Sequence, residues 1–72
     1  MANFKEVNKA IKEAYPTLDI KAVRCNGYVY FDGESGFDRL ESIYTHPTRT
    51  STENMIKFCF RRIDEAIEEG EL

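Results

Sequence analysis

The sequence contains no tryptophan, one histidine and two cysteines among its 72 residues. A zinc site draws its ligands mainly from cysteine and histidine, and three such residues scattered along the chain do not form a compact set. His46 also has no other residue at the spacing of a catalytic triad. Cys25 or Cys59 served by His46 as a base is the conceivable nucleophile, but packing is the commoner role of cysteine. We therefore expect a protein that is not an enzyme, with no metal and no cofactor.

The sequence also lacks a signal peptide and any apolar run long enough to cross a membrane, which predicts a cytoplasmic protein without membrane contact. Thiols stay reduced in that compartment. We expect Cys25 and Cys59 to be free and to pack as small apolar side chains, with a disulfide between them as the alternative.

Basic residues are not in excess, because ten lysines and arginines face thirteen aspartates and glutamates, for a net charge of −3. Nucleic-acid-binding domains usually carry the opposite balance, so nucleic acid is not the partner that we expect. Cations at Lys5, Lys9 and Lys12, or at Arg61 and Arg62, keep a nucleic-acid-binding accessory protein open as an alternative.

An Asn-Gly pair at positions 26–27 lies between two runs of strand-forming residues and predicts a β-hairpin with a two-residue type I′ turn. This turn places Cys25 opposite Tyr28 and Lys21 opposite Asp32. Side chains of a strand alternate between its two faces. One face carries Ile20, Ala22, Arg24, Val29 and Phe31, and the other carries Lys21, Val23, Cys25, Tyr28, Tyr30 and Asp32. We expect the first face, which is the more apolar, to cover the core.

Two amphipathic segments flank the hairpin and predict helices. For the first, Asn3 and Glu6 form a reciprocal cap, and the helix runs from about Phe4 to Tyr15, where Pro16 ends it. For the second, residues 50–53 (Thr-Ser-Thr-Glu) form a capping box, and Gly70 ends the helix. Its predicted core stripe consists of Ile56, Phe60, Ile63 and Ile67, flanked by Met55, Cys59 and Ala66.

A loop and a third strand are predicted between the hairpin and the second helix. Residues 33–39 contain two glycines and no periodicity, and the acidic residues near them, Asp32, Glu34 and Asp38, lack the ligand order of a calcium loop. Residues 40–45 alternate well enough for a strand antiparallel to the second one. The predicted fold is therefore a single α+β domain over residues 1–72. Its element order is α-β-β-β-α, with a three-stranded antiparallel sheet and two helices packed on one face.

The open face of this sheet is predicted to display tyrosines. Tyr28 and Tyr30 lie on it, and Tyr44 joins them if Ile43 faces the core; the opposite choice buries Leu40 and Tyr44. Tyrosine is enriched at protein interfaces, although it is also a common strand residue. Two further sets of candidates for partner binding lie on the second helix. Phe58 is either covered by a loop or exposed for a partner, and the acidic end at Glu68 and Glu69 either contacts a basic surface or only aids solubility.

Several segments resemble small proteins encoded by tailed bacteriophages and prophages. They are an amphipathic first helix, the run Cys-Asn-Gly-Tyr-Val-Tyr-Phe-Asp at 25–32, a glycine loop, Ser42-Ile43-Tyr44 and a closing helix. The resemblance implies a phage accessory protein that acts by binding a host protein, for instance as an inhibitor of a defence system in the manner of an anti-CRISPR. It implies no catalytic residues.

From these observations we expect a small non-enzymatic module that binds a host protein in the host cytoplasm. Its predicted partner-binding residues are Tyr28, Tyr30, Tyr44, Phe58, Glu68 and Glu69. A homodimeric structural or scaffold protein, in which the tyrosines form the dimer contact, is an alternative, as is the nucleic-acid-binding protein named above.

Overall fold

The structure is a computed structural model that describes residues 1–72. Its elements, in chain order, are α1 (Phe4–Ala14), β1 (Lys21–Arg24), β2 (Val29–Asp32), the 3₁₀ helix η1 (Pro47–Arg49) and α2 (Thr52–Glu68). The fold is α+β, as predicted, but its sheet is smaller. No helix combines the length and the apolar character that a membrane crossing requires.

The β-hairpin forms where the Asn-Gly pair predicts it. β1 and β2 pair antiparallel in the predicted register, with Ala22 opposite Phe31. Ala22, Val29 and Phe31 are buried, whereas Tyr28 is exposed, so the prediction of the core-facing side is confirmed. The predicted turn type is wrong, because Gly27 has a positive φ of 88° and Asn26 does not. A positive φ at the second central position alone is the pattern of a type II turn rather than of type I′.

The predicted third strand does not form, and the sheet has two strands. Only Ile43 pairs with β2, through an isolated antiparallel bridge in which Ile43 and Val29 exchange backbone hydrogen bonds of 2.8 and 2.9 Å. At one end of the segment the Leu40 N–H donates to the Gly36 carbonyl and holds Leu40 in a turn. At the other end Pro47 begins η1. Of residues 41–46, which lie between these two points, only Ile43 pairs with β2.

α1 begins at Asn3, whose side-chain oxygen accepts hydrogen bonds from the N–H groups of Lys5 and Glu6. The predicted return bond from Glu6 to the Asn3 N–H is wrong, because this N–H donates to Thr52 Oγ1 at 2.9 Å. The start of α1 is thereby attached to the first turn of α2.

α2 begins at Ser51, whose Oγ accepts a hydrogen bond from the Asn54 N–H at 3.1 Å. The predicted core stripe of this helix is only partly right. The buried residues of α2 are Met55, Cys59, Ile63 and Ala66. Of the predicted stripe only Ile63 is fully buried, and Ile67 is 43% exposed. The face of α2 that contacts the core is therefore centred on Met55, Cys59 and Ala66, which the prediction placed at the edge of the stripe.

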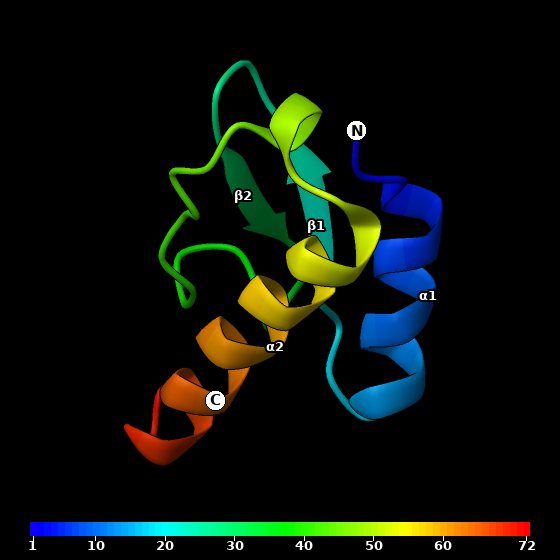
Figure 1. Cartoon of the computed structure of the whole chain (residues 1–72). Coiled ribbons are helices and arrows are strands. Elements are labelled where there is room, and N and C mark those ends of the chain that lie inside the picture. The colour runs from blue at the N-terminus through cyan, green and yellow to red at the C-terminus, as the bar shows by residue number, and fades with distance from the viewer.

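One hydrophobic core joins the helices to the inner face of the hairpin, with eleven buried residues in a single cluster. Figure 1 shows α1 beside β1 and α2 passing in front of the sheet, with the C-terminal end of α2 extending beyond it. Near that end the Tyr15 hydroxyl donates to Asp64 Oδ1 at 2.6 Å, and the Tyr15 ring packs edge-on against Phe60. Burial, aided by the Asp64 carboxylate, raises the pKa of Tyr15.

The side chain of Asn8 attaches α1 to the outer edge of β1. Its Nδ2 donates to the Ala22 carbonyl at 3.0 Å, and its Oδ1 accepts from the Ala22 N–H at 2.7 Å. The two hydrogen bonds satisfy both backbone groups of Ala22, which no neighbouring strand reaches. Asn8 thus takes the place of a strand residue at this edge.

Asp19 holds the loop that follows β2. Its carbonyl accepts from the Ser35 N–H at 3.0 Å, and its carboxylate accepts from the Glu34 N–H at 3.0 Å. Gly33 lies so close that an added Cβ would be 2.3 Å from the Asp19 carbonyl oxygen. This loop therefore requires glycine at position 33.

Candidate functional site

The tyrosines of the hairpin and of the segment after it form one surface. We call the group of Tyr28, Tyr30 and Tyr44 the tyrosine surface. The rings of Tyr28 and Tyr44 stack with their centroids 6.0 Å apart and an interplanar angle of 29°. Tyr44 is 83% exposed and Tyr28 is 37% exposed, whereas Tyr30 is half-buried. The two outer rings are therefore the parts of this surface that another molecule can reach.

The exposure of Tyr44 follows from the single bridge of its neighbour. Ile43 pairs with Val29 and is buried, so alternation along the extended chain turns Tyr44 outwards. The predicted arrangement with Ile43 in the core is confirmed, and the alternative that buries Tyr44 is wrong. One backbone bridge thus suffices to place Tyr44 against Tyr28 without a complete third strand.

The phenol of Tyr28 remains neutral at ordinary pH. The neighbouring side chain of Cys25 is the main cause that raises the pKa of Tyr28, with smaller contributions from burial and from the neighbouring tyrosines. A neutral hydroxyl keeps its hydrogen-bond donor. Tyr28 is therefore suited to hydrogen bonding at an interface and is not an activated nucleophile.

A groove of about 450 Å³ runs beside Tyr44, between the segment 43–45 and α2. Its lining residues are Ile43, Tyr44, Thr45, Phe58, Arg61, Arg62 and Glu65. We call it the Phe58 groove. Phe58 is half-buried there and packs against the core, so it is neither fully covered by the loop nor fully exposed. The groove continues the tyrosine surface, because Tyr44 belongs to both.

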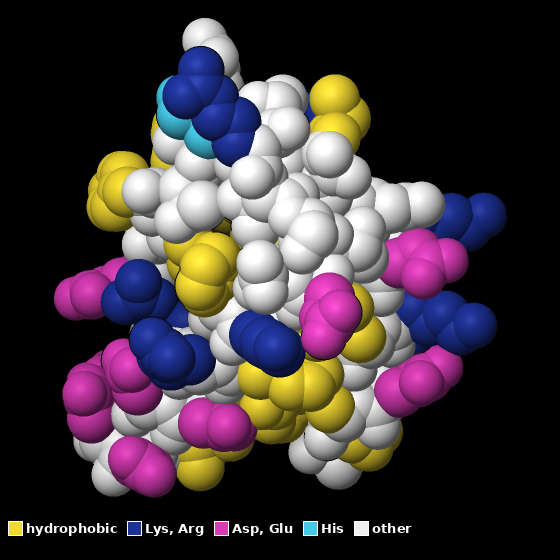
Figure 2. All heavy atoms as spheres, in the orientation of Figure 1, with side chains coloured by type: hydrophobic (Ala, Val, Ile, Leu, Met, Phe, Trp, Pro, Cys, Tyr) yellow, Lys and Arg dark blue, Asp and Glu magenta, His cyan; other side chains and the backbone are white.

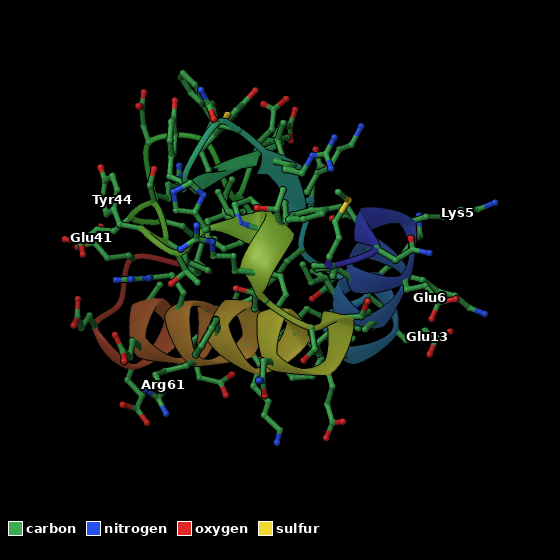
Figure 3. The ribbon with its side chains drawn as sticks, turned by 45° about the horizontal axis from the view of Figure 1, so that its top comes forward. Lys5, Glu6, Glu13, Glu41, Tyr44 and Arg61 are labelled. Atoms are coloured by element: carbon green, nitrogen blue, oxygen red, sulfur yellow. The ribbon has the colours of Figure 1, made fainter.

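The acidic candidates lie away from the tyrosines, at the other end of α2. Glu69 lines a second groove of about 350 Å³ together with other charged residues, while Glu68 is exposed outside it. An ion pair between Glu41 and Arg62, with 3.1 Å between its charged atoms, lies where the two grooves meet. Figure 3 shows Glu41 and Tyr44 close together on the same side of the molecule. The structure therefore groups the aromatic candidates and separates Glu68 and Glu69 from them.

Sequence reasoning did not find the Phe58 groove or the position of Arg61 within it. The helical spacing of Phe58, Arg61 and Arg62 is visible in the sequence and places the three residues on one side of α2. The path of residues 43–45, which forms the opposite wall, is not visible there. The sequence therefore indicates one wall of the groove, on α2, but not the other.

No group of three or more His, Cys, Asp or Glu side chains is arranged to hold a metal ion. His46 is exposed and lies beside the hairpin turn, where an added Cβ on Gly27 would be 3.6 Å from the imidazole. Cys59 is fully buried in the core, and burial raises the pKa of its thiol to about 12. A thiol with this pKa is protonated at neutral pH, so Cys59 serves packing.

The two cysteines are expected to differ in reactivity. Both thiols are free, and Cys25 is half-buried near the hairpin turn while Cys59 is enclosed. At mildly alkaline pH a disulfide reagent such as Ellman's reagent should modify only one thiol in the folded chain and both in urea, because the thiolate is the reactive form. A Cys25→Ser variant should lose the fast reaction completely. Fast modification of the folded Cys25→Ser variant would mean that Cys59 is accessible.

Comparisons with known proteins give no relative for this chain. A scan against protein-family models finds no match, and the searches of curated proteins and of solved structures find no chain that matches either. The tyrosine surface and the Phe58 groove are therefore the features from which a function has to be inferred.

Proposed function

We propose that this chain is a small non-enzymatic module that binds another protein through its tyrosine surface. The observation that carries the proposal is the stack of Tyr44, 83% exposed, on Tyr28. Nothing inside the fold requires Tyr44, because Ile43 already provides the contact of this segment with the core. A large aromatic side chain that the core does not use is available for a partner.

The stack is suited to recognition for two physical reasons. Tyrosine presents a large contact area and loses little side-chain entropy on binding, which is why it is enriched among residues that dominate binding energy. The Tyr28 ring also supports the Tyr44 ring before any partner arrives, so less ordering is needed on association. The stacked pair of phenols thus offers apolar area and hydrogen-bond donors at one place.

The resemblance to small phage and prophage proteins supports a particular setting for this module. We propose that the partner is a host protein in the bacterial cytoplasm and that binding inhibits or redirects it, as an accessory or anti-defence protein would. Such a role requires an accessible binding surface and no catalytic group. The tyrosine surface meets this requirement.

Replacing Tyr28 and Tyr44 together with serine tests the proposal. The variant should stay folded, with a loss of stability within about 1 kcal/mol, because one ring is largely exposed and the other partly so. Its affinity for the partner should fall by about thirtyfold or more, as for a cluster of hot-spot residues worth about 2 kcal/mol. The partner would be isolated from host lysate with the tagged wild-type chain, and both affinities would then be measured by calorimetry.

The matched control is Phe37→Ser, which removes an aromatic ring that is 58% exposed and lies outside both the stack and the Phe58 groove. This variant should bind the partner like the wild type. Equal binding by the folded Tyr28/Tyr44 double variant would exclude the tyrosine surface.

A homodimer is the second candidate, because the same exposed stack can pack against the stack of a second copy of the chain. Light scattering at high protein concentration distinguishes a dimer from a monomer.

A further inference from the structure

We infer that the Phe58 groove accepts a segment of the partner that carries an apolar side chain next to an Asp or Glu. The inference rests on the proposed function and deepens it, since it assigns a chemistry to what binds beside the tyrosine surface. The groove lies between residues 43–45 and α2 and shares Tyr44 with that surface. A partner seated on Tyr44 therefore reaches the groove without a gap.

The apolar part of the groove is formed by Ile43, Tyr44 and Phe58. Ile43 is buried and Phe58 is half-buried, and both belong to the side of the core that faces this opening. Figure 2 shows hydrophobic atoms exposed on this side of the molecule directly above a band of Lys and Arg side chains. An apolar side chain of the partner that packs against Tyr44 and Phe58 removes the exposed part of their rings from water. This favours binding in proportion to the area covered.

The arginines at the rim of the groove favour a partner in which an acidic residue adjoins the apolar one. Arg62 already forms an ion pair with Glu41, with 3.1 Å between its charged atoms. Arg61 forms neither an ion pair nor a side-chain hydrogen bond, and it projects from α2 into solvent in Figure 3. Glu65, one turn further along α2, also lines the groove but forms no ion pair with Arg61. A planar guanidinium without a partner is a binding group for a carboxylate, with which it can form two parallel hydrogen bonds.

Aromatic and arginine side chains also occur together in nucleic-acid-binding sites, but the charges here favour a peptide. A nucleic-acid strand brings a phosphate with every nucleotide, and successive phosphates would meet Glu65 and Glu41 next to Arg61. The net charge of −3 of the whole chain repels a strand with many phosphates more strongly than a peptide with one carboxylate. A peptide needs to bring only one carboxylate, and this can be placed on Arg61 alone.

A selection from random linear peptides tests the inference on the full chain. The immobilised protein should enrich peptides in which Asp or Glu adjoins a large apolar residue. For a synthetic peptide of the enriched sequence, Arg61→Glu should lower the affinity by about tenfold or more, equivalent to about 1.4 kcal/mol. Replacing the acidic residue of the peptide with Lys should restore binding to the Arg61→Glu variant. Lys5→Glu, which makes the same charge change on the exposed part of α1, is the matched control and should change the affinity by less than about twofold.

Several results would overturn the inference. They are enrichment of basic or uncharged peptides, absence of any enriched sequence, equal losses for Arg61→Glu and Lys5→Glu, and failure of the charge-reversed peptide to rescue binding. Salt-dependent binding of a single-stranded oligonucleotide that Arg61→Glu abolishes would also overturn it, in favour of a nucleic-acid ligand. If a partner isolated from lysate loses its affinity for the Tyr28/Tyr44 double variant but not for Arg61→Glu, the proposed function stands and this inference fails.

Discussion

Gly33→Ala is expected to destabilise the fold by more than about 3 kcal/mol, which approaches the whole stability of a domain of this size. Gly33 has a positive φ of 95°, a conformation that costs a residue with a Cβ of order 1–3 kcal/mol. The added Cβ would also lie 2.3 Å from the Asp19 carbonyl oxygen and 2.9 Å from its carbon. Relieving this overlap requires Asp19 to move away, and its bonds to Glu34 and Ser35 would be lost.

Gly70→Ala is the matched control for this prediction. Gly70 has a similar φ of 78°, but an added Cβ there meets no atom within 4 Å. Its substitution should therefore cost only the conformational strain, about 1 kcal/mol. Urea denaturation followed by circular dichroism measures both losses. Equal losses at the two positions would show that the close approach of Gly33 to Asp19 contributes nothing to stability.

Asn8→Ala is expected to destabilise the fold by about 2–3 kcal/mol, although alanine is the better helix former. The substitution leaves the N–H and the carbonyl of Ala22 without the hydrogen bonds of 2.7 and 3.0 Å that Asn8 supplies. Ala22 is buried, so water does not readily replace these bonds. The loss should appear in urea denaturation and, locally, as faster hydrogen exchange of the Ala22 amide.

Two further variants separate the Asn8 hydrogen bonds from other effects. Lys9→Ala changes an exposed neighbour on α1 and should alter stability by less than about 0.5 kcal/mol. Asn8→Asp keeps the acceptor for the Ala22 N–H but places a carboxylate oxygen where the donor to the Ala22 carbonyl was, so it should remain clearly less stable than the wild type at neutral pH. An Asn8→Ala variant as stable as Lys9→Ala would contradict the role given to this side chain.

The hairpin could be predicted in detail because its signals are local. A two-residue Asn-Gly loop leaves one way to pair the flanking residues, and strict alternation then decides which side chains share a face. The turn type could not be predicted equally well, because Asn26 tolerates both signs of φ. Only the pairing of the strands mattered for the tyrosine surface, so this error had no effect on the candidate site.

The third strand and the buried face of α2 depend on tertiary contacts that the sequence does not display. Leu40–Thr45 has the alternation of a strand, but Leu40 is held by the turn from Gly36, Pro47 begins η1, and only Ile43 pairs with β2. On α2, apolar residues are abundant on two neighbouring stripes that share Ile63. Which stripe is buried depends on where α1 and the sheet end, and Ile67 lies beyond that contact.

The candidate site was partly predictable for the same reason. The proximity of Tyr44 to Tyr28 followed from alternation about Ile43, whereas the Phe58 groove required the path of residues 43–45. Polar residues with structural roles were missed, because Asn8 and Asp19 resemble ordinary solvated positions. A short polar side chain within a helix interior, where asparagine is unfavourable, is the signal that could have drawn attention to Asn8.

Each edge of the two-stranded sheet is capped at one residue from within the chain, by Asn8 at Ala22 and by Ile43 at Val29. An incoming polypeptide that adds itself as a further strand, the mode by which many small domains capture linear peptides, would have to displace one of these contacts to pair along a whole edge. The same contacts interrupt the template for intermolecular sheet growth, so the purified chain should resist fibril formation as long as α1 stays attached. Recognition is left to side chains, and a few substitutions on one face would suffice to redirect the protein to a new partner without altering its backbone.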